Sequence, residues 1–68
     1  MKTSDGQDVL ESFPMGSGYC IRIAYDGYYL VAGMNSVGEY RKGRYRLTDK
    51  EARLLFNAKK AVFRSINS

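Results

Sequence analysis

Apolar and polar residues alternate most regularly over residues 19–34, on both sides of Asp26-Gly27. An Asp-Gly pair between two β-rich runs is typical of a two-residue type I′ hairpin turn, because glycine adopts positive φ freely and aspartate does so at low cost. This turn predicts the register Tyr25 opposite Tyr28, Ile23 opposite Leu30, Ile21 opposite Ala32 and Tyr19 opposite Met34. These facing pairs share one apolar face, which we expect to form the core. The other face carries a mixed set: Cys20, Arg22, Ala24, Tyr29, Val31 and Gly33.

Residues 35–38 indicate a second turn, and residues 39–47 predict a third strand. Alternation in this strand is imperfect, since its two tyrosines fall on opposite parities. Either Gly43 is a bulge that switches the parity, or a small extra hairpin turns at Lys42-Gly43. The many cations of this segment suit an exposed sheet edge, where charge discourages aggregation.

Residues 48–66 predict a helix. Thr48 and Glu51 have the spacing of a capping box, in which the Thr48 hydroxyl accepts from the Glu51 amide and the Glu51 side chain reaches back. At about 100° per residue, an apolar stripe runs along this helix, and we expect it to cover the apolar hairpin face. Lys59 projects into the centre of the stripe, and Leu54 projects to the outer face. The stripe consists of Ala52, Leu55, Phe56, Val62, Phe63 and Ile66.

Residues 1–18 mix Gly, Ser, Asp and one Pro with few apolar side chains, which indicates a short N-terminal arm with room for one short helical turn. Pro14 disfavours helical geometry at Phe13, and Gly16-Ser17-Gly18 is typical of a flexible joint. The predicted fold is therefore α+β. Residues 19–68 form a small β-β-β-α domain, a three-stranded antiparallel sheet packed on one C-terminal helix.

The composition limits the chain to one small globular domain. It has 68 residues, of which 44% are hydrophobic and 26% charged. This size is close to the lower limit for a self-supporting core. No apolar run is long enough for a membrane span or a secretory signal, so we expect no membrane partner. The single cysteine, which cannot form an intramolecular disulfide, favours a reducing, cytoplasmic setting.

Candidate catalytic groups are scarce. The chain has no histidine, which removes the commonest general base and the commonest zinc ligand. The single cysteine, Cys20, cannot form an intramolecular disulfide, and we interpret it as a small, partly buried residue. Asp49 and Glu51 suit a helix N-terminus, and the other acids are scattered. We therefore expect no enzyme activity, no cofactor and no metal.

Charge is distributed unevenly around a net charge of +4. Residues 1–20 hold one basic and three acidic residues, whereas residues 41–64 hold nine basic and two acidic residues. A basic body of this kind attracts nucleic acid, an acidic protein face or an anionic membrane surface.

Two basic surfaces are candidate partner-binding sites. The first is a stripe on the predicted helix, whose members recur at spacings of three and four: Lys50, Arg53, Asn57, Lys60 and Arg64. The simpler interpretation of this stripe is a solvated outer face of the helix. The second lies on the predicted third strand and consists of Arg41, Arg44, Tyr45 and Arg46. These residues also suit an exposed sheet edge, where charge discourages aggregation. Arg22 and Tyr29 join the candidates because their parity points away from the expected helix.

The order hairpin, third strand, capped helix carries a resemblance at the level of topology. The span YCIRIAYDGYYLVAGMNSVGEYRKGRYRLTDKEARLLF resembles the layout of small phage anti-CRISPR proteins. That resemblance implies a non-catalytic inhibitor that binds a CRISPR effector complex. The same span is similar to the three-stranded DNA-binding domains of integrases and of plant AP2 factors. AP2 factors use tryptophans in the sheet, and this chain has none.

We therefore expect a non-enzymatic binding protein of phage or mobile-element type, which docks on an acidic protein or nucleoprotein complex. The alternative is a DNA-binding domain that reads nucleic acid with its basic sheet. Cations on an exposed sheet face favour DNA, whereas cations on the outer stripe of the helix favour a protein partner. The chain is expected to be a monomer, or a homodimer that pairs two exposed sheet faces.

Overall fold

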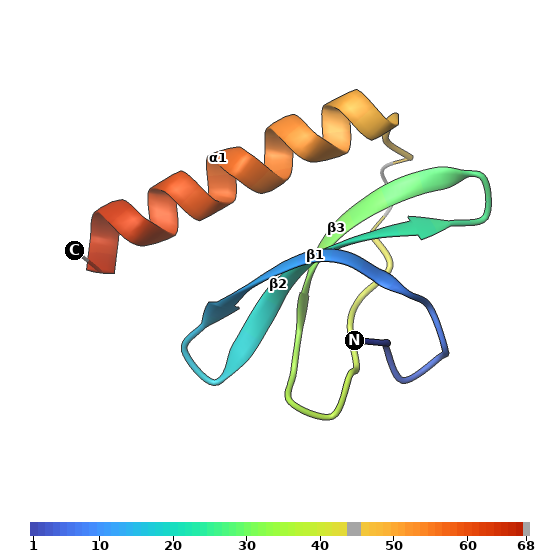
Figure 1. The fold of residues 1–68 in the computed structure, drawn as a ribbon, viewed down its shortest axis with the longest axis horizontal. Helices are drawn as coiled ribbons and strands as arrows, with labels where there is room; N and C mark the ends of the chain where they lie inside the picture. The colour runs from blue at the N-terminus through green and yellow to red at the C-terminus, as the bar shows by residue number, and fades with distance from the viewer. Residues whose placement is uncertain (44–45, 68) are drawn as a thin grey trace.

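The computed structural model describes residues 1–43 and 46–67. It contains strands β1 (Val9–Met15), β2 (Gly18–Tyr25) and β3 (Tyr28–Met34), followed by helix α1 (Asp49–Asn67). The strands form an antiparallel sheet in the order β1-β2-β3, and α1 lies across one side of it (Figure 1). The predicted fold class, a three-stranded antiparallel sheet with one C-terminal helix, is confirmed.

The β2–β3 hairpin has the predicted turn and register. Asp26 and Gly27 both have positive φ, 50° and 82°, as a type I′ turn requires. Tyr25 pairs with Tyr28, and the pairing continues without a shift to Tyr19 and Met34. The turn residues alone therefore set which side chains share a face.

The membership of the sheet differs from the prediction, because β1 comes from the segment expected to be a loose arm. Gly16-Ser17 is a tight turn rather than a flexible joint, with Gly16 at φ 56°. Phe13 pairs with Cys20 across β1 and β2 and is buried. Pro14 is tolerated because β1 is an edge strand, which pairs with a neighbouring strand on one side only, so a residue without an N–H is acceptable there. Local sequence propensity did not predict β1, because the strand depends on the burial of Phe13 in tertiary contacts.

Residues 39–47 were predicted as the third strand, but the described part of this range, residues 39–43 and 46–47, forms no strand and only touches the outer edge of β3. In the described part of this segment, only Tyr40 and Leu47 form bridges, with Met34 and Tyr29 respectively. Seven residue steps separate these two bridge residues, but only five separate their partners on β3. The unequal spacing is incompatible with one regular ladder between the two bridges, and the described residues between them, 41–43 and 46, pair with no strand. The bulge and the extra hairpin that the sequence suggested near Lys42-Gly43 involve residues outside the described part of the chain.

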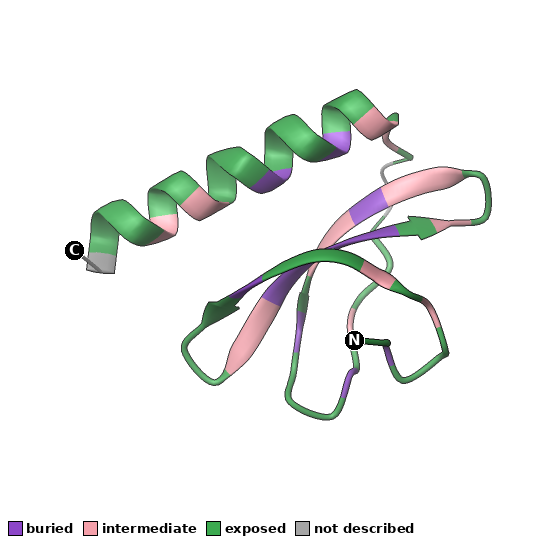
Figure 2. Ribbon diagram, in the orientation of Figure 1, coloured by how far each residue is buried: buried purple, intermediate pink, exposed green. Residues whose placement is uncertain are grey.

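Helix α1 covers the face of the sheet opposite to the one predicted. Phe56 is fully buried and packs edge-on against Phe13, with ring centroids 5.3 Å apart. Cys20 belongs to the same cluster, and Val31 packs against it. Figure 2 shows the buried positions of α1 on its sheet-facing side and exposed positions elsewhere. Phe13 gives this mixed face an aromatic centre, and complete burial of one such side chain contributes about 1.5–3 kcal/mol.

The apolar hairpin face is instead covered by two irregular segments, residues 1–8 and 35–43, on the side away from α1 (Figure 1). Its buried core consists of Ile21, Ile23, Leu30 and Met34. The two segments are joined where the Ser4 amide donates to the Gly38 carbonyl at 2.8 Å, and where the Tyr40 hydroxyl donates to Asp5 at 2.9 Å. Burial, reinforced by the bond to Asp5, raises the pKa of Tyr40 to about 12. Segments of the chain itself therefore pack on both faces of the sheet, and the face under α1 remains open at Ala24 and Gly33, which are exposed.

Candidate functional site

Helix α1 begins with the predicted capping box. The Thr48 amide donates to the Glu51 carboxylate at 2.9 Å, and the Glu51 amide donates to the Thr48 hydroxyl at 3.2 Å. These bonds from Thr48 lower the pKa of Glu51. The cap satisfies two amides that a helix N-terminus otherwise leaves unpaired, so it fixes where α1 starts.

Four of the five cations of α1 lie with Asn57 along one flank of the helix, and Lys59 lies elsewhere. We call this flank the basic ridge: Lys50, Arg53, Asn57, Lys60 and Arg64. Lys60 is half-buried, and the other ridge residues are exposed. Arg53 contacts Asp49 at 2.9 Å, an exposed pair of the kind that contributes little to stability. The sequence has no acidic residue from Ala52 to Ile66. The predicted helix stripe is thus available for a partner, and its positive charge is not neutralised within the helix beyond the first turn.

Arg22 was predicted to contact a partner, and the structure buries it instead. Its Nη2 donates to Glu11 at 2.8 Å and its Nη1 donates to Asp49 at 3.2 Å. Only 5% of the residue is exposed. The reason is the choice of face, since α1 covers the side of the sheet from which Arg22 projects. Arg22 therefore joins β1, β2 and the start of α1, and cannot contact a partner.

Tyr29 was expected to be an exposed interface residue on the sheet. It lies on the face that α1 covers and is half-buried, and its backbone pairs with that of Leu47 through bonds of 2.9 and 3.3 Å. Tyr29 therefore shares the face on which α1 packs, whereas the sequence analysis placed it on the side away from the helix. Its role as a partner contact stays a prediction, and so does the homodimer.

The second basic candidate is only partly described. Arg41 is exposed, and Arg46 lies over the ring of Tyr28 with 5.2 Å between the guanidinium carbon and the ring centroid. Arg44 and Tyr45 lie outside the described residues. Arg41 and Arg46 belong to the connection before α1, whereas the ridge residues belong to α1, so the two predicted basic surfaces come from different segments of the chain.

The sequence analysis missed an apolar groove beside α1. It has a volume of about 630 Å³ and lies between the C-terminal half of α1 and β3. Val62 and Ile66 line it, although both were assigned to the core stripe. The sequence did contain one indication of the groove: Lys59 falls within the apolar stripe, and a cation in an apolar row indicates that the row is not fully buried.

Cys20 lies under α1 near this groove and is buried. Burial raises the pKa of its thiol, and the Lys59 ammonium acts in the opposite direction. A buried neutral thiol is a poor nucleophile. The interpretation of Cys20 as a packing residue fits these surroundings, although it is more buried than expected.

Comparison with protein-family models, curated proteins and solved structures finds no match to this chain. Within residues 1–43 and 46–67, no group of three or more Cys, Asp and Glu side chains is placed to hold a metal ion. In the same residues, no helix is both long and apolar enough to cross a membrane. Functional inference therefore depends on the surface that the fold presents.

Proposed function

We propose that this chain is a non-enzymatic binding protein that docks on an acidic face of a protein or nucleoprotein complex. The resemblance to small phage anti-CRISPR proteins implies this mode of action, and we propose an inhibitor or adaptor in the host cytoplasm. The observation that carries the proposal is the basic ridge of α1, which presents exposed cations on a rigid, capped helix. A rigid element keeps such charges in fixed register with a partner's carboxylates or phosphates.

The position of the cations favours a protein face over sequence reading by the sheet. Arg22 is withdrawn into the interior, and the sheet has α1 on one face and residues 1–8 and 35–43 on the other. A sheet that reads the DNA major groove needs an open face with exposed side chains. The ridge has no such requirement, because it binds through charge on the outside of a helix.

The first test compares three anionic probes: a poly-glutamate peptide, duplex DNA and single-stranded DNA. Affinity is measured by fluorescence anisotropy at low and at moderate salt, with unlabelled wild-type protein. We expect the poly-glutamate peptide to bind with an affinity that falls as salt rises, because screening weakens exposed ion pairs. A Lys60→Glu/Arg64→Glu variant should lose at least about tenfold in affinity, which corresponds to about 1.4 kcal/mol.

The matched control compares two single substitutions that change the net charge equally: Arg64→Glu on the ridge, and Lys2→Glu, which lies outside both basic candidates. Lys2→Glu should retain most of the affinity, because the ridge is intact. Equal losses in the two variants would mean that net charge alone attracts the probe, and would contradict a role for the ridge. Absence of binding to every probe at low salt would contradict the proposal as a whole. Binding of duplex DNA alone would favour the DNA-binding alternative.

A further inference from the structure

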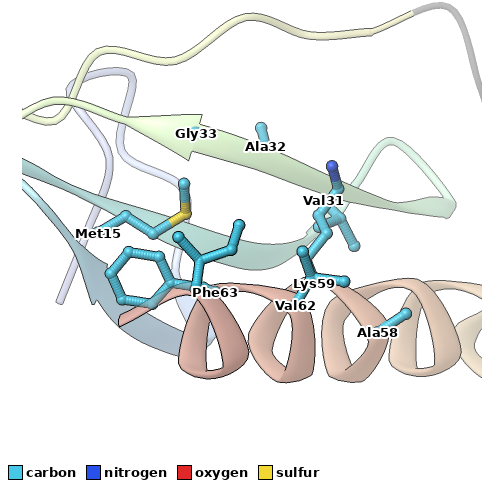
Figure 3. A pocket seen from close by; sticks show the side chains of 9 residues that line it. Met15, Val31, Ala32, Gly33, Ala58, Lys59, Val62 and Phe63 are labelled. Atoms are coloured by element: carbon cyan, nitrogen blue, oxygen red, sulfur yellow. The ribbon is translucent and has the colours of Figure 1, made fainter. Parts of the chain in front are cut away.

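The apolar groove is open because burial declines along α1. Ala52 and Phe56 are fully buried, Phe63 is half-buried, and Ile66 is 76% exposed. One wall of the groove is α1 from Ala58 to Ile66, and the other is β3 with Met15 at one end (Figure 3). Gly33 lies in the β3 wall, where its missing side chain leaves space, since nothing would stand within 4 Å of an added Cβ.

The exposed wall of α1 continues as an apolar row towards the N-terminus. Leu55, Val62 and Ile66 are 39%, 59% and 76% exposed and recur at helical spacing on the flank away from the basic ridge. From Leu55 to Ile66 the row spans about 16 Å, or three helical turns. Single exposed apolar residues are ordinary on a protein surface, but three of them on one flank of a helix, beside an apolar groove, form a candidate contact surface.

The groove carries positive charge only. Lys59 extends from α1 across the groove in Figure 3, and no acidic residue lines it. Among the residues that the structure describes, Lys59 forms no ion pair. An occupant that is wholly apolar would leave this ammonium without a counter-charge, whereas a carboxylate would pair with it.

The charge also disfavours a second copy of this chain as the occupant. Two copies packed groove to groove would bring Lys59 against Lys59, and α1 offers no acid beyond Glu51 to compensate. An added strand is disfavoured as well, because the outer edge of β3 is already bridged at both ends by Tyr40 and Leu47. A helix from a different protein, apolar on one side and acidic beside it, satisfies both the shape and the charge.

We propose that the groove receives an acidic amphipathic helix of a partner protein, with a carboxylate seated against Lys59 and apolar side chains against Val62 and Ile66. This inference rests on the proposed function for the acidic character of the partner. It adds a second contact on the other flank of α1 from the basic ridge. The two flanks would then hold one partner by charge on one side and by apolar burial on the other.

The probe is a synthetic helical peptide of about 18 residues, with leucine at every third or fourth position and glutamate and alanine elsewhere. Its partner peptide has lysine in place of every glutamate. We expect the acidic peptide to bind wild-type protein with a Kd of about 100 µM or tighter, and the basic peptide to bind at least about tenfold more weakly. Lys59→Glu should reverse the preference, which a change that merely damaged the fold would not do.

Two further variants separate this inference from the proposed function. Val62→Ser/Ile66→Ser should lose the amphipathic peptide and keep poly-glutamate, whereas Lys60→Glu/Arg64→Glu should lose poly-glutamate and keep most of the amphipathic peptide. Both serines replace exposed side chains, and circular dichroism verifies that the fold is retained. Peptide binding that survives Val62→Ser/Ile66→Ser would overturn the groove as its site. Loss of the amphipathic peptide only in the ridge variant would overturn the inference and leave the proposed function standing. Sedimentation that shows a dimer abolished by Val62→Ser/Ile66→Ser would identify a second copy as the occupant instead.

Discussion

Removal of the two carboxylates around Arg22 should destabilise the protein more than removal of Arg22 itself. The Arg22 side chain is 7% exposed, whereas Glu11 and Asp49 are 44% and 43% exposed. The arginine therefore depends on its partners for its charge to be tolerated, while the carboxylates also contact water. The Nε of Arg22 is buried and has no hydrogen-bond partner among the described residues. The guanidinium therefore has no further polar contact that would replace a lost bond to Glu11 or Asp49.

The magnitudes follow from this asymmetry. Glu11→Gln/Asp49→Asn keeps the shape of both side chains but leaves a buried cation without counter-charge, a change that costs about 3–5 kcal/mol. Arg22→Met fills the same space with an apolar chain and releases two carboxylates to water, for which we expect about 1 kcal/mol or less. A chain of this length has about 3–10 kcal/mol of stability in total. The carboxylate variant should therefore be close to unfolding, and the methionine variant should not.

The assay is urea unfolding followed by circular dichroism, with a triple variant that combines all three substitutions. Because the triple variant holds no buried charge, it should recover most of the stability that Glu11→Gln/Asp49→Asn loses. Arg53→Gln is the control for the other ion pair of Asp49, and it should cost about 0.5 kcal/mol or less. Arg22→Met as the most destabilising change, or a triple variant no more stable than the double, would refute this account of the buried charge.

Three further predictions concern a turn, the helix cap and the thiol. Gly38→Ala should lower the thermal midpoint more than Gly27→Ala, because both have positive φ (88° and 82°) but only at Gly38 would the new Cβ meet backbone, at 2.9 Å; equal midpoints would contradict the close approach. The pKa of Glu51 is lowered from 4.5 by its bonds with Thr48, so its stabilisation is complete above that pH and is lost as pH falls through the lower folded-state pKa. Glu51→Gln should therefore flatten the acid dependence of urea midpoints between about pH 6 and pH 3, and an unchanged slope would argue against the cap. Cys20 should react with a thiol reagent only as fast as the protein opens, because it is 2% exposed and burial raises its pKa; immediate labelling of the folded protein would show that the face is not covered.

Local chemistry made the hairpin and the start of the helix predictable. The Asp26-Gly27 turn fixes the β2–β3 register through backbone geometry, and Thr48 and Glu51 satisfy each other within one helical turn. Neither feature needs a distant contact. A turn signal of the same kind exists at Gly16-Ser17, between β1 and β2, but Pro14 beside it favoured the interpretation of a loose arm.

Distant contacts decided what the sequence could not predict. The face covered by α1 depends on Phe13, whose value as an aromatic anchor appears only once β1 is in the sheet. Arg22 is satisfied by residues 11 positions before and 27 positions after it, a spacing with no local signature. The groove exists because α1 continues past the point where its side chains reach the sheet, and helical periodicity alone does not show where burial ends.

Chemical-shift mapping of ¹⁵N-labelled protein during titration with poly-glutamate tests the central claim most directly. The proposal predicts that the largest shifts follow the outer flank of α1 over residues 50–64 and diminish as salt is added. Strands β2 and β3 should change little, because they carry none of the ridge residues. Shifts concentrated in the β2–β3 hairpin or in residues 39–43, with α1 unaffected, would contradict the basic ridge as the binding surface.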